Sequence, residues 1–280
     1  MNRDKILGAV DNLFCLYSSL AGLDRGVRIL MYHLVAKEAR PGEKQLLTVS
    51  APRFREQLEL IKRLGIRVVS LQEALNLLGQ DQKSGRCVAI TFDDFFSETI
   101  EYAVPVLEQF KFPAGFFVVT DYLDQRERFA WLENSEQYPF AGTKEMVREL
   151  SRKGFEIGSH TCSHPRLNKL TREQLHQELQ GSRKVLEDLC GKKVEFFAYP
   201  YGDVSTTSDL IRQAIKESGY AAGLGTLVGI NRDLKNPYFM FRTYVTEYDC
   251  GEKFEKKLKG GHDWYRSWQK FQHYRNFGEK

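Results

Sequence analysis

Short apolar runs alternate with longer stretches that carry helix-capping residues along the chain from Val27 onward. The runs are rich in β-branched and aromatic residues, as strands are. Strands that alternate with helices in this way are typical of βα units around a parallel sheet. The predicted strands are Val27–Val35, Arg67–Leu71, Cys87–Phe92, Ala114–Val119, Phe155–Ser159, Phe196–Tyr199, Ala221–Leu224 and Phe239–Val245.

Capping residues mark where the predicted helices begin and end. Three starts carry a signal, namely Ser50 before Pro52, Ser70 with Glu73 three residues later, and Thr171 with Gln174 three residues later. Glycines stand where the helices are expected to stop, at Gly65, Gly79, Gly154, Gly191 and Gly219.

Both ends of the chain differ from this alternating middle. Apolar residues recur at helical spacing between Ile6 and Ala21, which predicts an amphipathic helix. Its polar face is not basic, which favours docking on the rest of the protein over a membrane surface. No linker rich in Pro, Gly or Ser divides the remainder. We therefore expect an N-terminal helix in residues 1–24, one domain in 25–250 and a tail in 251–280.

Residues 121–142 interrupt the alternation with a polar stretch that carries Phe129, Trp131, Tyr138 and Phe140. The stretch is too long for an ordinary connection, so it is a candidate substrate-facing insertion. Packing of the rings against the body of the protein is an equally good interpretation.

The composition narrows the possible partners. Hydrophobic residues make up 42% of the chain and charged residues 28%, near the globular average. The net charge is +4, and residues 251–280 alone hold eight Lys or Arg against four Asp or Glu, so the rest is close to neutral. This balance argues against nucleic-acid binding. The tail has Trp264, Trp268, Phe271 and Arg275 at helical spacing, so it either packs on the body or associates peripherally with a membrane.

The cysteines and the first residues bear on location. Five cysteines without C-x-x-C spacing indicate neither a disulfide framework nor a thiolate zinc site. Arg3, Asp4 and Lys5 lead into a broken apolar pattern rather than a signal peptide. We therefore expect a cytoplasmic protein without a membrane span, and leave open an association with the inner face of the membrane.

Three predicted strands run directly into residues that could carry chemistry. Asp93 and Asp94 follow one strand, His160 and His164 follow another, and the turn Pro200–Gly202 follows a third. Catalytic groups of parallel α/β folds collect at such strand ends. Each group alone also fits a helix cap, a structural histidine or an ordinary turn.

Two imidazoles and one carboxylate would leave coordination positions of a metal open for a water and a substrate oxygen, as hydrolysis needs. The neighbouring carboxylate could then act as a base. Backbone N–H groups of the Pro/Gly turn could face a developing oxyanion. These ligands suit zinc, and also cobalt, nickel or iron.

Together the three stretches resemble the polysaccharide deacetylase family, the NodB-homology enzymes of carbohydrate esterase family 4. The motifs are T-F-D-D at Thr91–Asp94, H-T-x-x-H at His160–His164 and P-Y-G at Pro200–Gly202. The resemblance runs from about Ile29 to Val245. It implies a single-domain, distorted (β/α) barrel of about seven parallel strands.

The resemblance also implies roles for individual residues. Asp94, His160 and His164 would be the metal ligands and Asp93 the general base. The backbone N–H of Tyr201 would be an oxyanion donor, with Pro200 and Tyr201 on the substrate side of the site.

Two departures from the family pattern concern Asp93 and the general acid. The third motif usually begins with an Arg that holds the base, but Ala198 stands at that position. Arg242 in the last strand is a hypothetical substitute, facing the base or the substrate. The motifs Asp-x-x-Asp-Trp and late Leu-x-His are not found. Met31-Tyr32-His33 resembles the permuted branch that includes the biofilm poly-N-acetylglucosamine deacetylases, which makes His33 either the general acid or a structural histidine.

The expected activity is metal-dependent removal of N-acetyl groups from a polysaccharide, an oligosaccharide or a lipid-linked glycan, with release of acetate. The partner would be an N-acetylated carbohydrate, and the oligomeric state is left open. Two alternatives remain: a deacylase of non-carbohydrate amides on the same barrel, and a carbohydrate-binding protein that has lost turnover.

Overall fold

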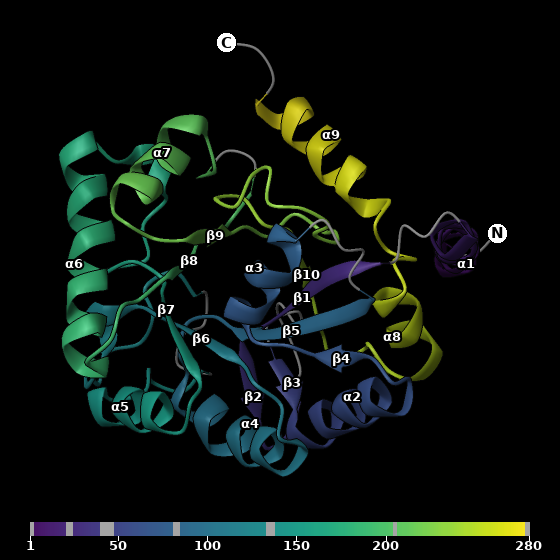
Figure 1. Ribbon diagram of the computed structural model, residues 1–280, viewed down its shortest axis with the longest axis horizontal. Helices are drawn as coiled ribbons and strands as arrows, with labels where there is room; N and C mark the ends of the chain where they lie inside the picture. Colours follow the sequence, from purple (N-terminus) through teal and green to yellow (C-terminus); the bar gives the residue numbers. More distant parts are fainter. Residues whose placement is uncertain are drawn as a thin grey trace.

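Seven parallel strands form a nearly closed barrel in the computed structural model (Figure 1). They follow one another in the order β10-β1-β5-β6-β7-β8-β9, and a parallel bridge from Leu224 to Met240 links the two edges. The strands are β1 (Gly26–Tyr32), β5 (Arg86–Phe92), β6 (Gly115–Val118), β7 (Glu156–Ser159), β8 (Phe196–Ala198), β9 (Ala222–Leu224) and β10 (Arg242–Tyr244). β4 (Arg67–Val68) pairs with β5, while β2 (Leu34–Ala36) pairs with β3 (Thr48–Ser50) outside the barrel. The expected distorted (β/α) barrel is confirmed.

The structure describes residues 3–20, 25–39, 48–80, 85–132, 138–203 and 206–277. Its helices are α1 (Arg3–Leu20), α2 (Ala51–Arg63), α3 (Leu71–Gly79), α4 (Ser97–Phe110), α5 (Lys144–Arg152), α6 (Arg172–Cys190), α7 (Asp209–Glu217), α8 (Gly251–Leu258) and α9 (Tyr265–Phe277). The caps expected at Ser50, Ser70 and Thr171 are confirmed, since each side chain accepts a hydrogen bond from the backbone N–H three residues later.

The two faces of the strands pack into separate clusters. Outward side chains such as Ile90 pack against the surrounding helices, and inward side chains such as Ala89 pack with α3. α3 covers the amino-terminal end of the barrel, because the N–H groups of Leu71 and Gln72 donate to the carboxylate of Glu156, the first residue of β7. The carboxyl ends of the strands therefore lie at the end of the barrel away from α3.

The predicted strand Val27–Val35 is interrupted at His33, where the chain leaves the barrel. The Thr99 hydroxyl replaces ladder hydrogen bonds at this point. It donates to the carbonyl oxygen of His33 at 3.0 Å and accepts from the N–H of Val35 at 3.0 Å. A side chain from α4 therefore makes the bend that ends β1 at Tyr32.

Two other predicted strands are shorter than expected. Arg67–Leu71 stops at Val68, because Ser70 caps α3. Phe239–Val245 begins only at Arg242, because the Asn231 side chain binds both the N–H and the carbonyl oxygen of Phe241.

The terminal segments pack on the barrel. α8 contributes Phe254 and Leu258 to the main hydrophobic cluster, so packing continues across the boundary expected at residue 250. The indole N–H of Trp264 donates to Asp11 of α1 at 2.7 Å. None of the helices in the described ranges is both long and apolar enough to cross a membrane.

Candidate active site

The candidate residues lie together at the carboxyl ends of the strands. Tyr32 pairs with Phe92 across β1 and β5, so His33 and Asp93 follow side by side. In the same way Ser159 pairs with Phe197 across β7 and β8, which places His160 beside the end of β8. Parallel pairing thus gathers groups that are far apart in the sequence.

Asp94, His160 and His164 converge into one cluster of possible metal ligands. Their ligand atoms all lie within 4.8 Å of one another, and all three side chains are buried. The Oδ1 atom of Asp94 is 3.6 Å from Nε2 of His160 and 3.7 Å from Nε2 of His164. Ligand atoms about 3.3 Å apart are expected around a four-coordinate zinc with bond lengths of about 2.0–2.1 Å. The two distances from Asp94 to the histidines therefore fit a small divalent cation after a slight contraction.

The backbone at the site adopts a conformation that non-glycine residues rarely take. Asp94, Thr161, His164 and Tyr201 have positive φ angles of 66°, 71°, 61° and 63°. Each such residue costs on the order of 1 kcal/mol or more, and such residues cluster at functional sites. The fold holds two of the three possible ligands, and the proposed oxyanion donor, in this way.

A polar atom at the centre of the cluster lacks a partner. Oδ1 of Asp94, which faces Nε2 of both histidines, is buried without a hydrogen bond to any described residue, and a cation would supply its partner. Burial and the neighbouring charge of Asp93 raise the pKa of Asp94 well above its usual range. Burial lowers the pKa of His160 and, with His160 nearby, lowers that of His164 well below the usual value. Neutral imidazoles are the ligating form, and a bound cation would stabilise the Asp94 carboxylate, so these residues fit a metal.

Two groups that the sequence did not reveal hold the histidine turn. Nδ1 of His160 lies 2.8 Å from the carbonyl oxygen of Ala198, which fixes the ring with Nε2 toward Asp94. The carboxylate of Glu178 on α6 accepts from the backbone N–H groups of Cys162 and Ser163. Glu178 belongs to an ordinary helix pattern, and only the tertiary contact distinguishes it.

Arg242 holds Asp93 by two parallel hydrogen bonds. Nη1 and Nη2 of Arg242 lie 2.7 Å from Oδ1 and Oδ2 of Asp93, and both side chains are buried. Burial alone would raise the pKa of Asp93, but the Arg242 charge and, to a lesser extent, His160 lower it to about 2. Arg242 thus occupies the place of the arginine missing at Ala198. Because it is fully buried, it offers no open face for the contact with substrate that was also expected.

His33 lies in the same electrostatic environment. Burial lowers the pKa of His33 to about 4, while the charge of Asp93 raises it and the charge of Arg242 lowers it. The imidazole is therefore neutral near pH 7 in the free protein. Its role as an acid stays a prediction.

The turn after β8 presents Tyr201 at the edge of the site. No described residue accepts a hydrogen bond from its backbone N–H. Gly202 has a positive φ of 56°, and a Cβ there would meet the backbone N of Thr226 at 2.9 Å, so the turn requires glycine. Pro200 precedes this turn and is buried.

Comparison with known proteins fits this geometry. The sequence profile of the family described as polysaccharide deacetylase matches residues 80–223, just over half of the chain. This chain belongs to the polysaccharide deacetylase family. It is therefore a hydrolase of carbon–nitrogen bonds other than peptide bonds.

Two relatives of the deacetylase are similar over most of its length. A Bacillus subtilis protein provisionally named polysaccharide deacetylase YxkH is 26% identical over 227 residues, which cover 81% of this chain and 74% of the relative. The poly-beta-1,6-N-acetyl-D-glucosamine N-deacetylase of Staphylococcus aureus is 26% identical over 77% of this chain and 73% of its own.

Solved structures share the fold of the deacetylase. The Streptococcus pyogenes deacetylase PplD, in complex with acetate, superposes with a TM-score of 0.71 at 22% identity and covers 83% of this chain and 97% of its own. IcaB from Ammonifex degensii gives a TM-score of 0.67 at 24% identity, over 85% of this chain and 97% of its own.

The aromatic segment 121–142 of the deacetylase both packs and faces the site, within its described residues. The Phe129 and Tyr138 rings of this segment are buried and pack in one cluster with Phe96. The Trp131 ring, by contrast, stacks on His164 with centroids 3.8 Å apart and remains half-exposed. Trp131 thus covers His164 at the edge of the site.

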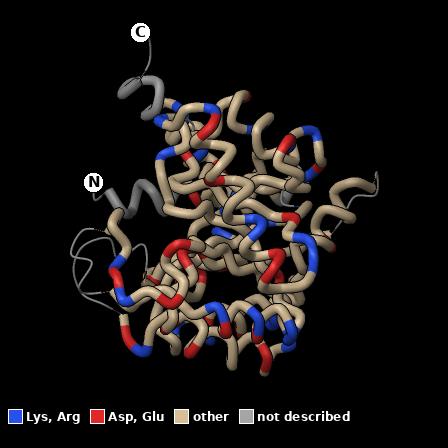
Figure 2. Tube along the Cα trace, turned by 90° about the vertical axis from the view of Figure 1, so that its left-hand side faces the viewer, with Lys and Arg blue, Asp and Glu red and all other residues tan. Residues whose placement is uncertain are grey.

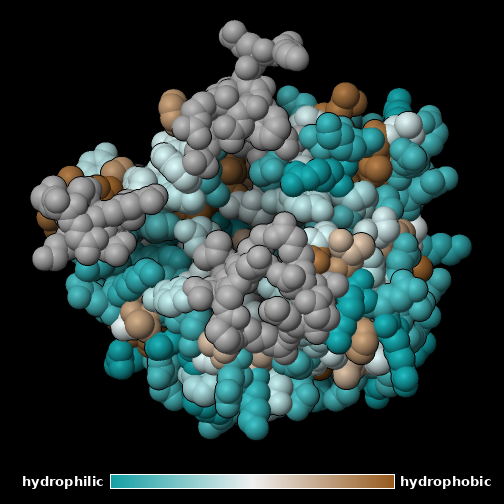
Figure 3. All heavy atoms as spheres, turned by 180° about the vertical axis from the view of Figure 1, so that it is seen from behind, coloured by the Kyte–Doolittle hydropathy of each residue, from teal (hydrophilic) through white to brown (hydrophobic). Residues whose placement is uncertain are grey.

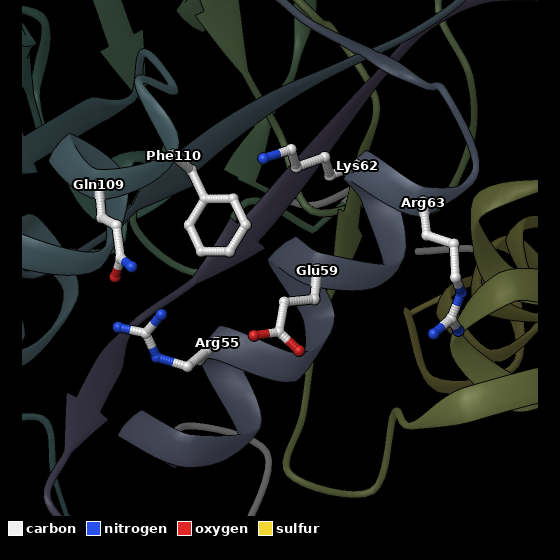
Figure 4. A pocket seen from close by; sticks show the side chains of 6 residues that line it. All are labelled: Arg55, Glu59, Lys62, Arg63, Gln109 and Phe110. Atoms are coloured by element: carbon white, nitrogen blue, oxygen red, sulfur yellow. The ribbon is translucent and has the colours of Figure 1, made fainter.

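The deacetylase also has a surface hollow far from these strand ends (Figure 4). It has a volume of about 460 Å³ and lies between α2 and α4, lined by Arg55, Glu59, Lys62, Arg63, Gln109 and Phe110. Lys62 and Arg55 point toward the Phe110 ring at 5.6 and 6.0 Å. It holds none of the candidate ligands and is not part of the site.

Proposed function

We propose that this deacetylase removes N-acetyl groups from an N-acetylated glycan and leaves acetate and a free amino sugar. The relative in Staphylococcus aureus, named for poly-beta-1,6-N-acetyl-D-glucosamine, supports this substrate class. The single observation that carries the proposal is the cluster of Asp94, His160 and His164 beside the buried Asp93–Arg242 pair.

The three clustered residues are the proposed metal ligands, with zinc expected and cobalt, nickel or iron as alternatives. A divalent cation held there supplies a water of lowered pKa and polarises the acetamide carbonyl. The chain itself fixes the donor atoms before binding, because Ala198 orients His160 and Glu178 braces the turn. This preorganisation reduces the cost of assembling the site.

Asp93 accepts the proton of the water that attacks the acetamide carbon. Its pKa of about 2 keeps it charged at any ordinary pH, so it is always available as an acceptor. A base of such low pKa holds the proton weakly and can pass it on. Arg242 is a positioning residue, which directs both carboxylate oxygens through its fixed fork.

The backbone N–H of Tyr201 stabilises the oxyanion of the tetrahedral intermediate, and His33 delivers a proton to the leaving nitrogen. The C–N bond then breaks, and acetate and the amine depart. With a pKa of about 4, His33 begins as a neutral imidazole. Negative charge that develops on the intermediate raises the pKa of His33, which takes up the proton that Asp93 removed from the water and delivers it to the leaving nitrogen.

The test is acetate release from short N-acetylglucosamine oligomers, combined with metal analysis of the purified protein. We expect about one divalent ion per chain, release of acetate, and its loss in Asp93→Asn. Asp188→Asn, an exposed carboxylate on α6, is the matched control and retains activity.

Three other results would contradict parts of the proposal. Turnover that survives in Asp93→Asn excludes Asp93 as the base. Release of acyl groups only from non-carbohydrate amides changes the substrate class. Binding of oligomers without any acetate release indicates a carbohydrate-binding protein.

A further inference from the structure

Exposed apolar side chains gather on the first and last helices. Ten large hydrophobic residues are exposed among the described residues, and five of them belong to α1 and α9. Leu13, Leu16 and Tyr17 share one face of α1 and are 60–67% exposed. Trp268 and Phe271, one turn apart on α9, are 38% and 60% exposed. Brown atoms at the left edge of Figure 3, where the half-turn brings α1, show part of this surface.

The two helices are fixed on the same side of the barrel. The Trp264 side chain just before α9 donates to Asp11 on α1, and His262 lies 3.6 Å from the same carboxylate. Arg28 of β1 binds Asp263 at 2.7 Å, which ties this junction to the barrel. We call the exposed faces of α1, α9 and the neighbouring α8, joined at this junction, the terminal face. These contacts hold α1 and the start of α9 against the barrel.

The terminal face is basic. Of the six Lys or Arg in residues 251–271, Lys257 is buried in an ion pair with Asp249, which leaves five against three Asp or Glu. The three acids are engaged, Glu252 with Lys256, Glu255 with Lys259, and Asp263 with Arg28. Within the described ranges no carboxylate lies within ion-pair distance of Lys253, Arg266 or Lys270. By contrast, Figure 2 shows both signs of charge mixed along the side that carries α5, α6 and α7.

We propose that the terminal face docks on an anionic lipid bilayer, with the apolar residues of α1 and α9 among the acyl chains and the lysines at the headgroups. An apolar helix face flanked by cations and aromatic rings is the pattern of interfacial helices. The polar face of α1 is not basic by itself, but α8 and α9 supply the charge beside it. The proposed contact is with the surface of the bilayer, through the exposed side chains of these helices.

The charge of the terminal face favours an anionic bilayer over a second copy of the chain as its binding partner. A symmetric dimer through the terminal face would bring Lys253, Arg266 and Lys270 against the same residues of the other copy. Like charges at a desolvated contact oppose association, whereas anionic headgroups neutralise them. The terminal face therefore suits anionic lipid better than the same face of a second copy of the chain.

The test is flotation of the full chain with lipid vesicles. With phosphatidylcholine vesicles that contain roughly one third phosphatidylglycerol, the wild type floats, and with phosphatidylcholine alone or at about 1 M salt it does not. In the double variant Leu13→Gln, Leu16→Gln, the bound fraction falls about tenfold, as it does in Trp268→Gln, Phe271→Gln. Lys253→Gln, Lys270→Gln weakens binding to the anionic vesicles only.

The matched control is Leu210→Gln, because Leu210 on α7 is 79% exposed and lies away from the terminal face. It floats like the wild type, and all variants keep the wild-type melting temperature and acetate release. Failure of the wild type to float on anionic vesicles overturns the proposal, as does an equal loss in Leu210→Gln. A concentration-dependent dimer that the Leu13→Gln, Leu16→Gln change disrupts, without vesicle binding, assigns the face to a second copy instead.

Discussion

Two arginine–aspartate pairs are anchored on adjacent strands of this barrel and lie on opposite faces of its wall, one inside and one outside. Arg242 of β10 points inward and holds Asp93 with both nitrogens at 2.7 Å. Arg28 of β1 points outward and holds Asp263 at 2.7 and 3.1 Å. Ile29, the residue beside Arg28, pairs with Arg242, so the two arginines differ by a single step of the strand alternation.

The surroundings of the two pairs differ more than their geometry. The Arg28 guanidinium also donates to Leu258 O and Thr243 Oγ1, so the outer pair is closed within the protein. The inner pair adjoins Asp94, whose buried Oδ1 atom lacks a described partner. The outer pair therefore ties the C-terminal segment to the barrel, while the inner pair leaves polar groups ready for a ligand. Buried ion pairs are weak evidence of stability by themselves, and variants can separate the two roles.

The largest contrast is expected in catalysis. Asp93→Asn should reduce kcat for acetate release by roughly 10²–10⁴-fold, since a positioned base contributes that much. Asp263→Asn makes the same chemical change in the outer pair and should leave kcat within about twofold of wild type. Metal content, measured in both, shows whether the site is still loaded. Equal losses of kcat in the two variants would mean that the pairs act only through the fold.

The second contrast is in stability. Arg28→Met leaves Asp263 without its partner and should lower the free energy of unfolding in urea by about 3 kcal/mol, toward the low end for buried pairs because Asp263 is partly exposed. Adding Asp263→Leu should restore most of the lost free energy of unfolding, because apolar residues often replace a buried ion pair without loss of stability. Arg242→Met with Asp93→Leu should likewise recover stability but not activity. Recovered activity in that double variant would contradict the role of the inner pair.

The inner pair and the cluster of possible metal ligands were largely predictable from the sequence. Asp93, Asp94, His160 and His164 follow apolar runs, and parallel strands bring such ends together by a local rule. Arg242 was proposed because the family position at Ala198 lacks an arginine, and the structure places it on Asp93.

The outer pair could not be read from the sequence. Arg28 and Asp263 are 235 positions apart, and each resembles an ordinary surface charge. Nor could the pattern reveal the break at His33 or the brace from Glu178, because Thr99 and Glu178 act through side chains of distant helices. The spacing of apolar residues predicts which face of a helix or strand is buried. These features depend instead on single tertiary hydrogen bonds, which override that local preference.

A third contrast is the response to metal removal. A chelator should abolish acetate release and lower the unfolding free energy by about 2.7 kcal/mol relative to protein with free metal at a hundredfold excess over its Kd. Zinc should restore both. His164→Gln should abolish this response, whereas Arg28→Met, already less stable, should keep it in full. A response that persists in His164→Gln would place the metal elsewhere.

The smallest contrast is in the pH dependence of stability, and it isolates the Asp93 charge. The pKa of Asp93 in the folded protein, about 2, lies below its ordinary 3.8, so its contribution is complete above about pH 4 and is lost as the pH falls toward 2. The raised pKa of Asp94 acts in the opposite direction. The comparison is therefore made without metal, between Asp94→Asn and Asp93→Asn, Asp94→Asn.

Urea unfolding of these two variants from pH 5 to pH 2 should show the single variant losing about 2 kcal/mol more than the double variant, by the shift in pKa. This result would show that Arg242 keeps Asp93 ionised, so that Asp93 stays charged wherever the enzyme is folded. If the two curves run parallel, Arg242 only orients Asp93, and the acid limit of acetate release would then follow titration of Asp93 at its ordinary pKa.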